Sequence, residues 1–124
     1  MSAMKDKPGC PATKERILRT IGLAYRASLL TSGFDAIEMA LHAGAVELLI
    51  VATDGSEKQR EKLIRIAEEE QVRWRRFATA EELGRAIGKD MRIAIAILDQ
   101  GMAKKLSEVI DEVSNSGKPD GLKQ

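Results

Sequence analysis

A chain of 124 residues with 44% hydrophobic and 31% charged side chains predicts one globular domain, neither disordered nor spanning a membrane. Twenty Lys and Arg against nineteen Asp and Glu give a net charge of +1, so any affinity for nucleic acid must come from a local surface. One cysteine, Cys10, and one histidine, His42, argue against an internal disulfide and against a metal site, and we expect a cytoplasmic protein without metal or cofactor.

The domain is predicted to cover residues 13–114, between a flexible N-terminal arm (1–12) and a flexible tail (115–124) that are rich in Gly, Pro, Ser and Lys. Thr13 has the position of an N-cap for a first helix, because helix-forming residues with apolar side chains at helical spacing follow it. Gly22 lies inside this helix, where glycine is unfavourable, and this indicates that another element packs closely against it.

A short strand and a second helix come next. The strand is predicted over residues 29–31. Ser32 and Asp35 have the spacing of a capping box for a helix that runs to Ala43. Gly33 follows Ser32 and, having no Cβ, allows another backbone to approach closely.

Three further strands and three helices are predicted to complete the chain. A nearly continuous apolar run over 46–52 is typical of a central strand covered on both faces. A strand is also expected over 72–77, where Val72 and Trp74 alternate with Arg73 and Arg75, so that the face with the arginines is toward solvent. Another strand is expected over 92–98. Three helix starts alternate with them, at Ser56 with Gln59, at Thr79 with Glu82, and after Asp99-Gln100-Gly101. This alternation predicts an α/β domain with helices on both faces of a sheet, a three-layer α/β/α sandwich.

Enzyme chemistry has little support in the sequence. Asp54 and Asp99 each end a predicted strand, a place where α/β folds often bind ligands, but a turn with a helix cap explains each of them more simply. The sequence has no glycine-rich phosphate loop, and one histidine gives no Ser/His/Asp set. We therefore expect a protein that is not an enzyme.

The strongest candidate site is the turn at Gly33, because the free N–H groups of a helix start carry partial positive charge and bind phosphates or base edges. The simpler alternative is a capped helix after a tight turn. A second signal is the helix-to-strand loop at Gly88, which is surrounded by Arg85, Lys89 and Arg92. We expect this loop at the same end of the domain as the Gly33 turn, where the two would form a phosphate-binding rim.

Several segments together resemble the L-seven-Ae/L-thirty-e family of ribosomal proteins, which are kink-turn RNA binders, and come closest to its small bacterial YlxQ-like branch. The segments are Leu23-Ala24-Tyr25-Arg26-Ala27, Ser32-Gly33, Ala43-Gly44, Leu48-Leu49-Ile50-Val51-Ala52-Thr53-Asp54 and Glu82-Leu83-Gly84-Arg85-Ala86-Ile87-Gly88. The resemblance covers roughly residues 17–106. It implies an α/β/α sandwich on a four-stranded mixed sheet, RNA binding and no catalysis.

The resemblance also implies where RNA would bind, namely at the turn into the second helix, after the central strand and after the fourth helix. The candidate RNA-binding residues are therefore Thr31, Ser32, Gly33, Phe34, Asp35, Ala36, Met39, Asp54, Arg85, Gly88, Lys89, Met91 and Arg92. The family's kink-turn readers carry Asn, Glu and Lys where this chain has Asp35, Ala36 and Met39, and these departures predict weak binding to a standard kink-turn.

We predict a small RNA-binding protein that recognises structured RNA, either ribosomal or otherwise kink-turn-like. Proteins of the ribosome or of transcription and translation are further expected partners. No association with a membrane is expected. The rival hypothesis is a protein-interaction module that keeps the fold and has lost strong RNA binding. In that case Phe34 and Met39 would be hydrophobic contacts within a polar rim.

Overall fold

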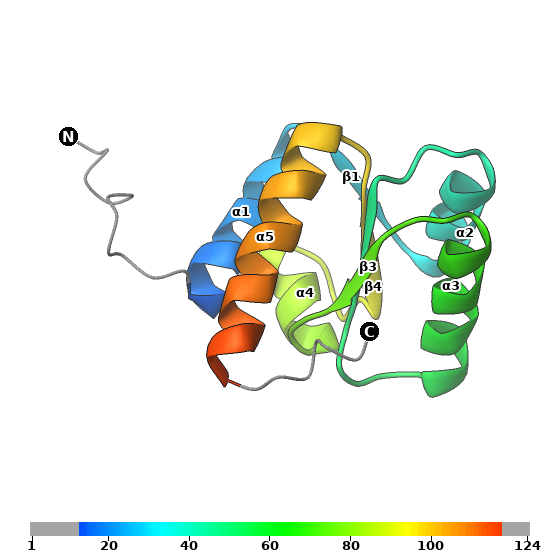
Figure 1. Cartoon of the computed structure of the whole chain (residues 1–124). Coiled ribbons are helices and arrows are strands. Elements are labelled where there is room, and N and C mark those ends of the chain that lie inside the picture. Colours follow the sequence, from blue (N-terminus) through cyan, green and yellow to red (C-terminus); the bar gives the residue numbers. More distant parts are fainter. Residues whose placement is uncertain (1–12, 118–124) are drawn as a thin grey trace.

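In the computed structural model, which describes residues 13–117, helices and strands alternate along the chain (Figure 1). The elements in order are α1 (Lys14–Arg26), β1 (Leu30–Ser32), α2 (Phe34–His42), β2 (Leu48–Val51), α3 (Glu57–Glu69), β3 (Trp74–Arg76), α4 (Ala80–Ala86), β4 (Ala94–Ile97) and α5 (Gln100–Gly117). The last helix continues three residues beyond the boundary expected at residue 114. The predicted arm and residues 118–124 of the predicted tail lie outside the described residues.

The four strands form one mixed sheet in the order β1-β4-β2-β3. Strand β4 runs antiparallel to both of its neighbours, with Ile97 opposite Leu30 of β1 and Ala96 opposite Leu49 of β2. Strand β3 runs parallel to β2, with Trp74 opposite Leu49. The apolar run predicted as a central strand therefore contains β2, which has neighbours on both sides and is buried along its whole length.

Helices cover both faces of this sheet and confirm the predicted α/β/α sandwich. Helices α1, α4 and α5 lie on one face, and α2 and α3 lie on the other (Figure 1). The two core strands alternate between the layers, since Ile95 and Ile97 face the first set of helices while Ala94 and Ala96 face the second. Small side chains on the second face leave room for α2, which contacts β4.

Three of the four predicted N-caps are confirmed. The Thr13 hydroxyl accepts a hydrogen bond from the Arg16 backbone N–H at 3.1 Å and begins α1. Ser56 caps α3 in the same way. At α4 both halves of the capping box are present, because Thr79 and Glu82 each accept from the other's backbone N–H. These starts are local, so three or four consecutive residues are enough to predict them.

The capping box predicted at Ser32 and Asp35 is wrong. Gly33 is the N-cap of α2, with φ +96° and ψ 134°, and it makes no side-chain capping hydrogen bond. Ser32 instead ends β1, where its backbone pairs with Ile95, and its hydroxyl accepts a hydrogen bond from the Arg92 Nε at 3.3 Å. Pairing with a distant strand decides the role of this serine, and the four-residue pattern cannot report it.

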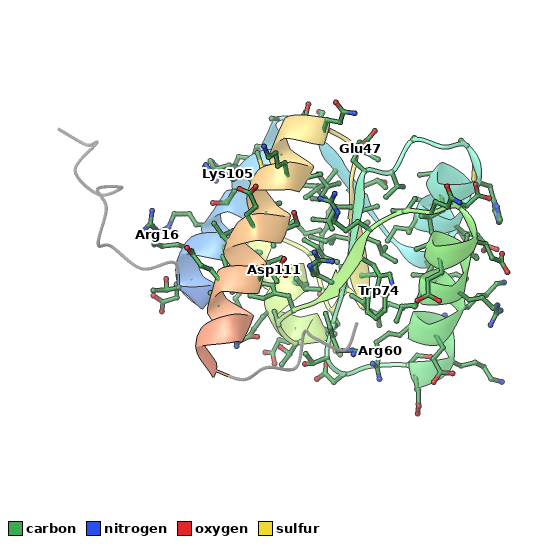
Figure 2. All side chains as sticks on the ribbon, viewed as in Figure 1. Arg16, Glu47, Arg60, Trp74, Lys105 and Asp111 are labelled. Carbon is green, nitrogen blue, oxygen red and sulfur yellow. The ribbon has the colours of Figure 1, made fainter. Side chains whose placement is uncertain are left out.

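One glycine, Gly22, and one arginine, Arg75, show how closely the helices pack on each other and on the sheet. A Cβ on Gly22 of α1 would lie 2.7 Å from the carbonyl oxygen of Ala86 on α4, which confirms the close packing expected there. On β3, Arg75 was expected to face solvent, but its guanidinium is half-buried under α5. There Nε and Nη2 donate to the two carboxylate oxygens of Asp111 at 2.7 and 3.1 Å. Asp111 lies on the α5 side of the strand and Trp74 on the α3 side (Figure 2).

Candidate functional site

Two loops that are about sixty residues apart in the sequence meet at one end of the sheet. One is the turn from β1 into α2, and the other is the α4–β4 loop (residues 87–93). The hydrogen bond from Arg92 to Ser32 joins them, while a second nitrogen of the same guanidinium donates to the Met91 carbonyl at 3.0 Å. The backbone N–H of Arg92 donates to the Ala80 carbonyl, also at 3.0 Å. The two predicted contact regions therefore lie side by side, as expected.

The turn at Gly33 is open. Apart from Gly33 and its two chain neighbours, no heavy atom of residues 13–117 lies within 4 Å of the place where a Cβ would stand, and the positive φ favours glycine for its own backbone conformation. Within residues 13–117 no side chain caps this helix start, so its first N–H groups have no side-chain partner. Asp35 in the first turn is exposed and adds a negative charge beside them. Thr31, one residue before Ser32, is half-buried in β1.

The outer face of α2 carries Ala36 and Met39, which are three residues apart and both exposed. Met39 is 72% exposed. Glu38 beside it is held by Lys62 of α3 in an ion pair of 3.4 Å. Phe34 is half-buried, packs against the core between α2 and α3, and has the Lys62 ammonium 5.5 Å from its ring centroid. Of the two hydrophobic contacts expected for a protein partner, Met39 is therefore free, while Phe34 serves the core.

The α4–β4 loop supplies the cations of the site. The Lys89 ammonium lies 5.9 Å from the ring centroid of Tyr25 on α1, a cation–π contact. Gly88 turns the chain with φ +74°, and Met91 is 59% exposed. Arg85 forms an exposed ion pair with Glu81 at 2.8 Å, so its charge is partly compensated at the site.

Asp54 and Asp99, the two carboxylates considered for catalysis, both hold helix starts. Asp54 lies after β2, is exposed, and accepts a hydrogen bond from the Ala80 N–H of α4 at 2.7 Å. Asp99 accepts from the Met102 N–H of α5 at 2.8 Å. Asp54 thus borders the candidate site while positioning α4, the helix that leads to the cationic loop.

Two residues of this neighbourhood were absent from the candidates chosen from the sequence. Tyr25 supports Lys89, and Lys62 covers Phe34. Helical periodicity could place Tyr25 on the partly buried side of α1, but its contact with a loop sixty-four residues later has no local signature. Lys62 lies in a helix of alternating charges, where one lysine cannot be distinguished from its neighbours.

A separate groove of about 1050 Å³ runs between β3 and α5. Its lining mixes Arg73, Arg75 and Lys104 with acidic residues that include Glu108 and Asp111. None of the candidate residues predicted from the sequence lines it. The balance of opposite charges gives it no preference for an anionic ligand.

Residues 13–117 contain neither a cluster of metal ligands nor a membrane-spanning helix. His, Cys, Asp and Glu side chains of this part nowhere gather in the groups of three or more that could hold a metal ion. None of its helices has both the length and the apolar character needed to cross a membrane.

Comparison with known proteins identifies one family model and two relatives that share a description. The sequence model of the ribosomal protein L7Ae/L30e/S12e/Gadd45 family matches residues 15–107. A protein of Bacillus subtilis described as RNA-binding protein YlxQ is 31% identical over 91 residues, which are 73% of this chain and 91% of the relative. A protein of Enterococcus faecium with the same description is 28% identical over 98 residues, 79% of this chain and 94% of the relative.

Two solved structures share the fold. A protein with unknown function from Bacillus halodurans C has a TM-score of 0.74 at 34% sequence identity, and the match covers 78% of this chain and 98% of that one. The Giardia lamblia 15.5kD RNA binding protein has a TM-score of 0.67 at 19% identity, covering 78% and 83%. At that identity the second likeness concerns the fold alone.

Proposed function

This chain belongs to the ribosomal protein L7Ae/L30e/S12e/Gadd45 family, and from that premise we propose that it binds structured RNA with the surface formed by the Gly33 turn and the α4–β4 loop. Two relatives that it matches over most of their length are described as RNA-binding proteins, which supports this proposal. The chain would act as a small RNA-binding component without catalysis.

The observation that carries the proposal is the hydrogen bond between Arg92 and Ser32. It joins a cationic loop to an open helix start, and these are the two features that a phosphate backbone requires. The uncapped N–H groups of α2 would donate hydrogen bonds to a phosphate or to the acceptor edge of a base, while Lys89 and Arg92 would neutralise neighbouring phosphates. Gly33 would let the RNA backbone approach because no atom stands in the way.

The preferred RNA would be bent or non-canonical, and a standard kink-turn would bind weakly. Ala36 and Met39 are exposed at the start of α2, but both side chains are uncharged and lack a strong hydrogen-bond acceptor, so they cannot replace a Glu that accepts from a base or a Lys that neutralises a phosphate. Asp35, when ionised, can only accept hydrogen bonds. Recognition would therefore rest on shape and on the cationic loop more than on base contacts.

The rival role in protein interaction has less support. It relied on Phe34 and Met39 as exposed hydrophobic contacts, and Phe34 is engaged with the core and with Lys62. Met39 and Met91 are exposed, but isolated exposed apolar side chains are common on protein surfaces.

A titration at several salt concentrations tests the proposal. Binding of the wild-type chain to a kink-turn RNA should weaken as salt rises, because each phosphate contact releases counterions. Lys89→Ala with Arg92→Ala should reduce the slope of log K against log salt by about 2, since each lost phosphate contact is worth about 1. The matched control is Lys58→Ala with Arg65→Ala, two exposed cations of α3. Equal slopes in the two double variants would contradict the proposal.

A further inference from the structure

The segment from Arg16 to Phe34 is unusual within this nearly neutral chain, since it contains three arginines and no Asp or Glu. The rest of the chain then carries 17 Lys and Arg against 19 Asp and Glu. The segment comprises nearly all of α1, the whole of β1 and the turn at Gly33. Lys and Arg are no denser in this stretch than in the rest of the chain, so its net positive charge comes from the absence of acidic side chains, and the stretch ends at the proposed RNA site.

The two cations of the α4–β4 loop, which form no ion pair within residues 13–117, lie against this same segment. Lys89 stacks on the ring of Tyr25, and Arg92 donates to Ser32. The two contacts mark two points along one path, because Tyr25 belongs to the last turn of α1 and Ser32 ends the following strand. The cationic surface of the proposed site thus continues from the Gly33 turn onto α1.

One face of α1 carries a row of exposed side chains. Arg19 and Arg26 are seven residues apart, close to two helical turns, so they share a face and are separated by about 10 Å along the helix. Both are exposed, and within residues 13–117 neither forms a hydrogen bond or an ion pair. Leu23 lies between them and is 55% exposed. Gly22, beside this face, contacts α4 through Ala86, which brings α1 close to the cationic loop.

We infer that the exposed face of α1 is a second RNA contact, on which Arg26 and then Arg19 bind phosphates of one duplex arm that extends from the Gly33 turn. This inference rests on the proposed RNA-binding function. It adds the direction in which the bound RNA arm would run and the length of the surface that the arm would contact. Lys89, supported by Tyr25, links the two parts of the surface.

The chemistry of this face favours RNA over other anionic partners. A membrane-surface helix needs a broad exposed apolar face, whereas the apolar side of α1 (Ile17, Ile21 and Ala24) is packed in the core and Leu23 is left alone outside. Two unpaired guanidiniums at a spacing of about 10 Å suit the regular charges of a nucleic-acid backbone, and arginine binds phosphate in a bidentate manner.

The test uses three forms of one kink-turn RNA: one with two short arms, one with only the first arm lengthened and one with only the second arm lengthened. Arg19→Gln with Arg26→Gln should bind the short-armed RNA as the wild-type chain does. On one of the two RNAs with a lengthened arm, the variant should bind about tenfold more weakly than the wild-type chain at low salt. On that RNA its slope of log K against log salt should be smaller than that of the wild-type chain by about 2. Native circular dichroism is expected, because both side chains are exposed and form no contact that the variant would break.

The matched control is Lys58→Gln with Arg65→Gln. These two cations of α3 are also seven residues apart and exposed, and they lie on the opposite layer of the domain. Equal losses in the two double variants would overturn the inference, because net charge alone would then explain them. Wild-type behaviour of the α1 variant would also overturn it and would leave the face to a protein or a membrane.

The second contact on α1 and the proposed site at Gly33 would fail under different results. If Lys89→Ala with Arg92→Ala weakens binding and the α1 variant does not, the second contact is refuted and the proposed site stands. If the wild-type chain binds none of the three RNAs, both the proposed site and the second contact are refuted.

Discussion

The carbonyl group of Asp90 rests on the Cα of Gly84, with no side chain between helix α4 and the loop that follows it. A Cβ at Gly84 would overlap this carbonyl, and the Lys89 N–H donates to the Gly84 carbonyl at 2.8 Å. The cationic loop of the proposed site is thus seated directly on a glycine of the preceding helix.

Gly84→Ala should therefore destabilise the domain and displace the loop. Overpacking costs about 1–3 kcal/mol, and the rigid backbone opposite Gly84 places this substitution at the upper end. Chemical denaturation should show a lower midpoint, and RNA binding should weaken because Lys89 and Arg92 move with the loop. Gly101→Ala is the control, since the nearest atom to its added Cβ is an Asp99 oxygen at 3.4 Å. Equal stability of the two variants would contradict the steric argument.

Gly33→Val should abolish most RNA binding while the domain stays folded. The site around the new side chain is empty, so the stability cost comes from the backbone at φ +96° and should be about 1–3 kcal/mol. Gly44→Val is a close match, because Gly44 also has a positive φ (+75°) and open surroundings, but lies at the other end of α2. Both variants should lose stability, and only Gly33→Val should lose binding in a titration. Wild-type affinity of Gly33→Val would make the turn purely structural.

Ala36→Glu with Met39→Lys should give the chain tighter binding to a standard kink-turn. The two positions share the exposed face at the start of α2, where the new side chains would meet no core residue. A good bidentate base contact is worth about 1–3 kcal/mol in DNA, and a comparable gain here corresponds to about tenfold or more in affinity. The measurement is a titration of both proteins against one kink-turn RNA at fixed salt. Tight binding by the native chain with no gain in the variant would locate recognition elsewhere.

Stability should fall in acid through Glu82. The backbone N–H of Thr79 donates to its carboxylate, and Lys14 donates from α1, so the pKa of Glu82 is lowered below its usual 4.5. A carboxylate with a lowered folded-state pKa contributes stability above its unfolded pKa, and this contribution is lost as pH falls through the folded value. Urea midpoints should therefore decline below about pH 4.5.

Glu82→Gln should flatten this acid limb, because the variant has no proton to take up at that position. Glu81→Gln removes the same charge from the neighbouring residue, which pairs with Arg85 at the surface, and should keep the limb. An identical pH dependence in wild type and Glu82→Gln would show that other carboxylates govern acid unfolding.

The elements of the fold were predictable where short patterns determine them. The caps at Thr13, Ser56 and Thr79 and the buried strand β2 follow from a few adjacent residues. The mixed character of the sheet came from the family resemblance, since alternation of helices and strands does not specify which strands run antiparallel, and the strand order β1-β4-β2-β3 became known only from the structure.

The roles decided by distant contacts were less accessible. Ser32 looked like a cap because the pattern around it cannot include Ile95 or Arg92, which lie about sixty residues away. Arg75 looked solvated because its partner Asp111 is thirty-six residues further along. For the candidate site, the sequence identified both loops, whereas the support of Lys89 by Tyr25 became visible only in three dimensions.

Arg75 also shields the open edge of the sheet. Arg73 and Phe77 direct their backbone groups toward β2, so the Trp74 carbonyl between them faces outward, and Arg75 Nη1 donates to it at 2.8 Å. A foreign strand seeking to pair with β3 would have to displace a guanidinium that Asp111 holds in place. We therefore expect the same arginine that joins β3 to α5 to hinder edge-to-edge aggregation, the usual hazard of an unpaired strand edge.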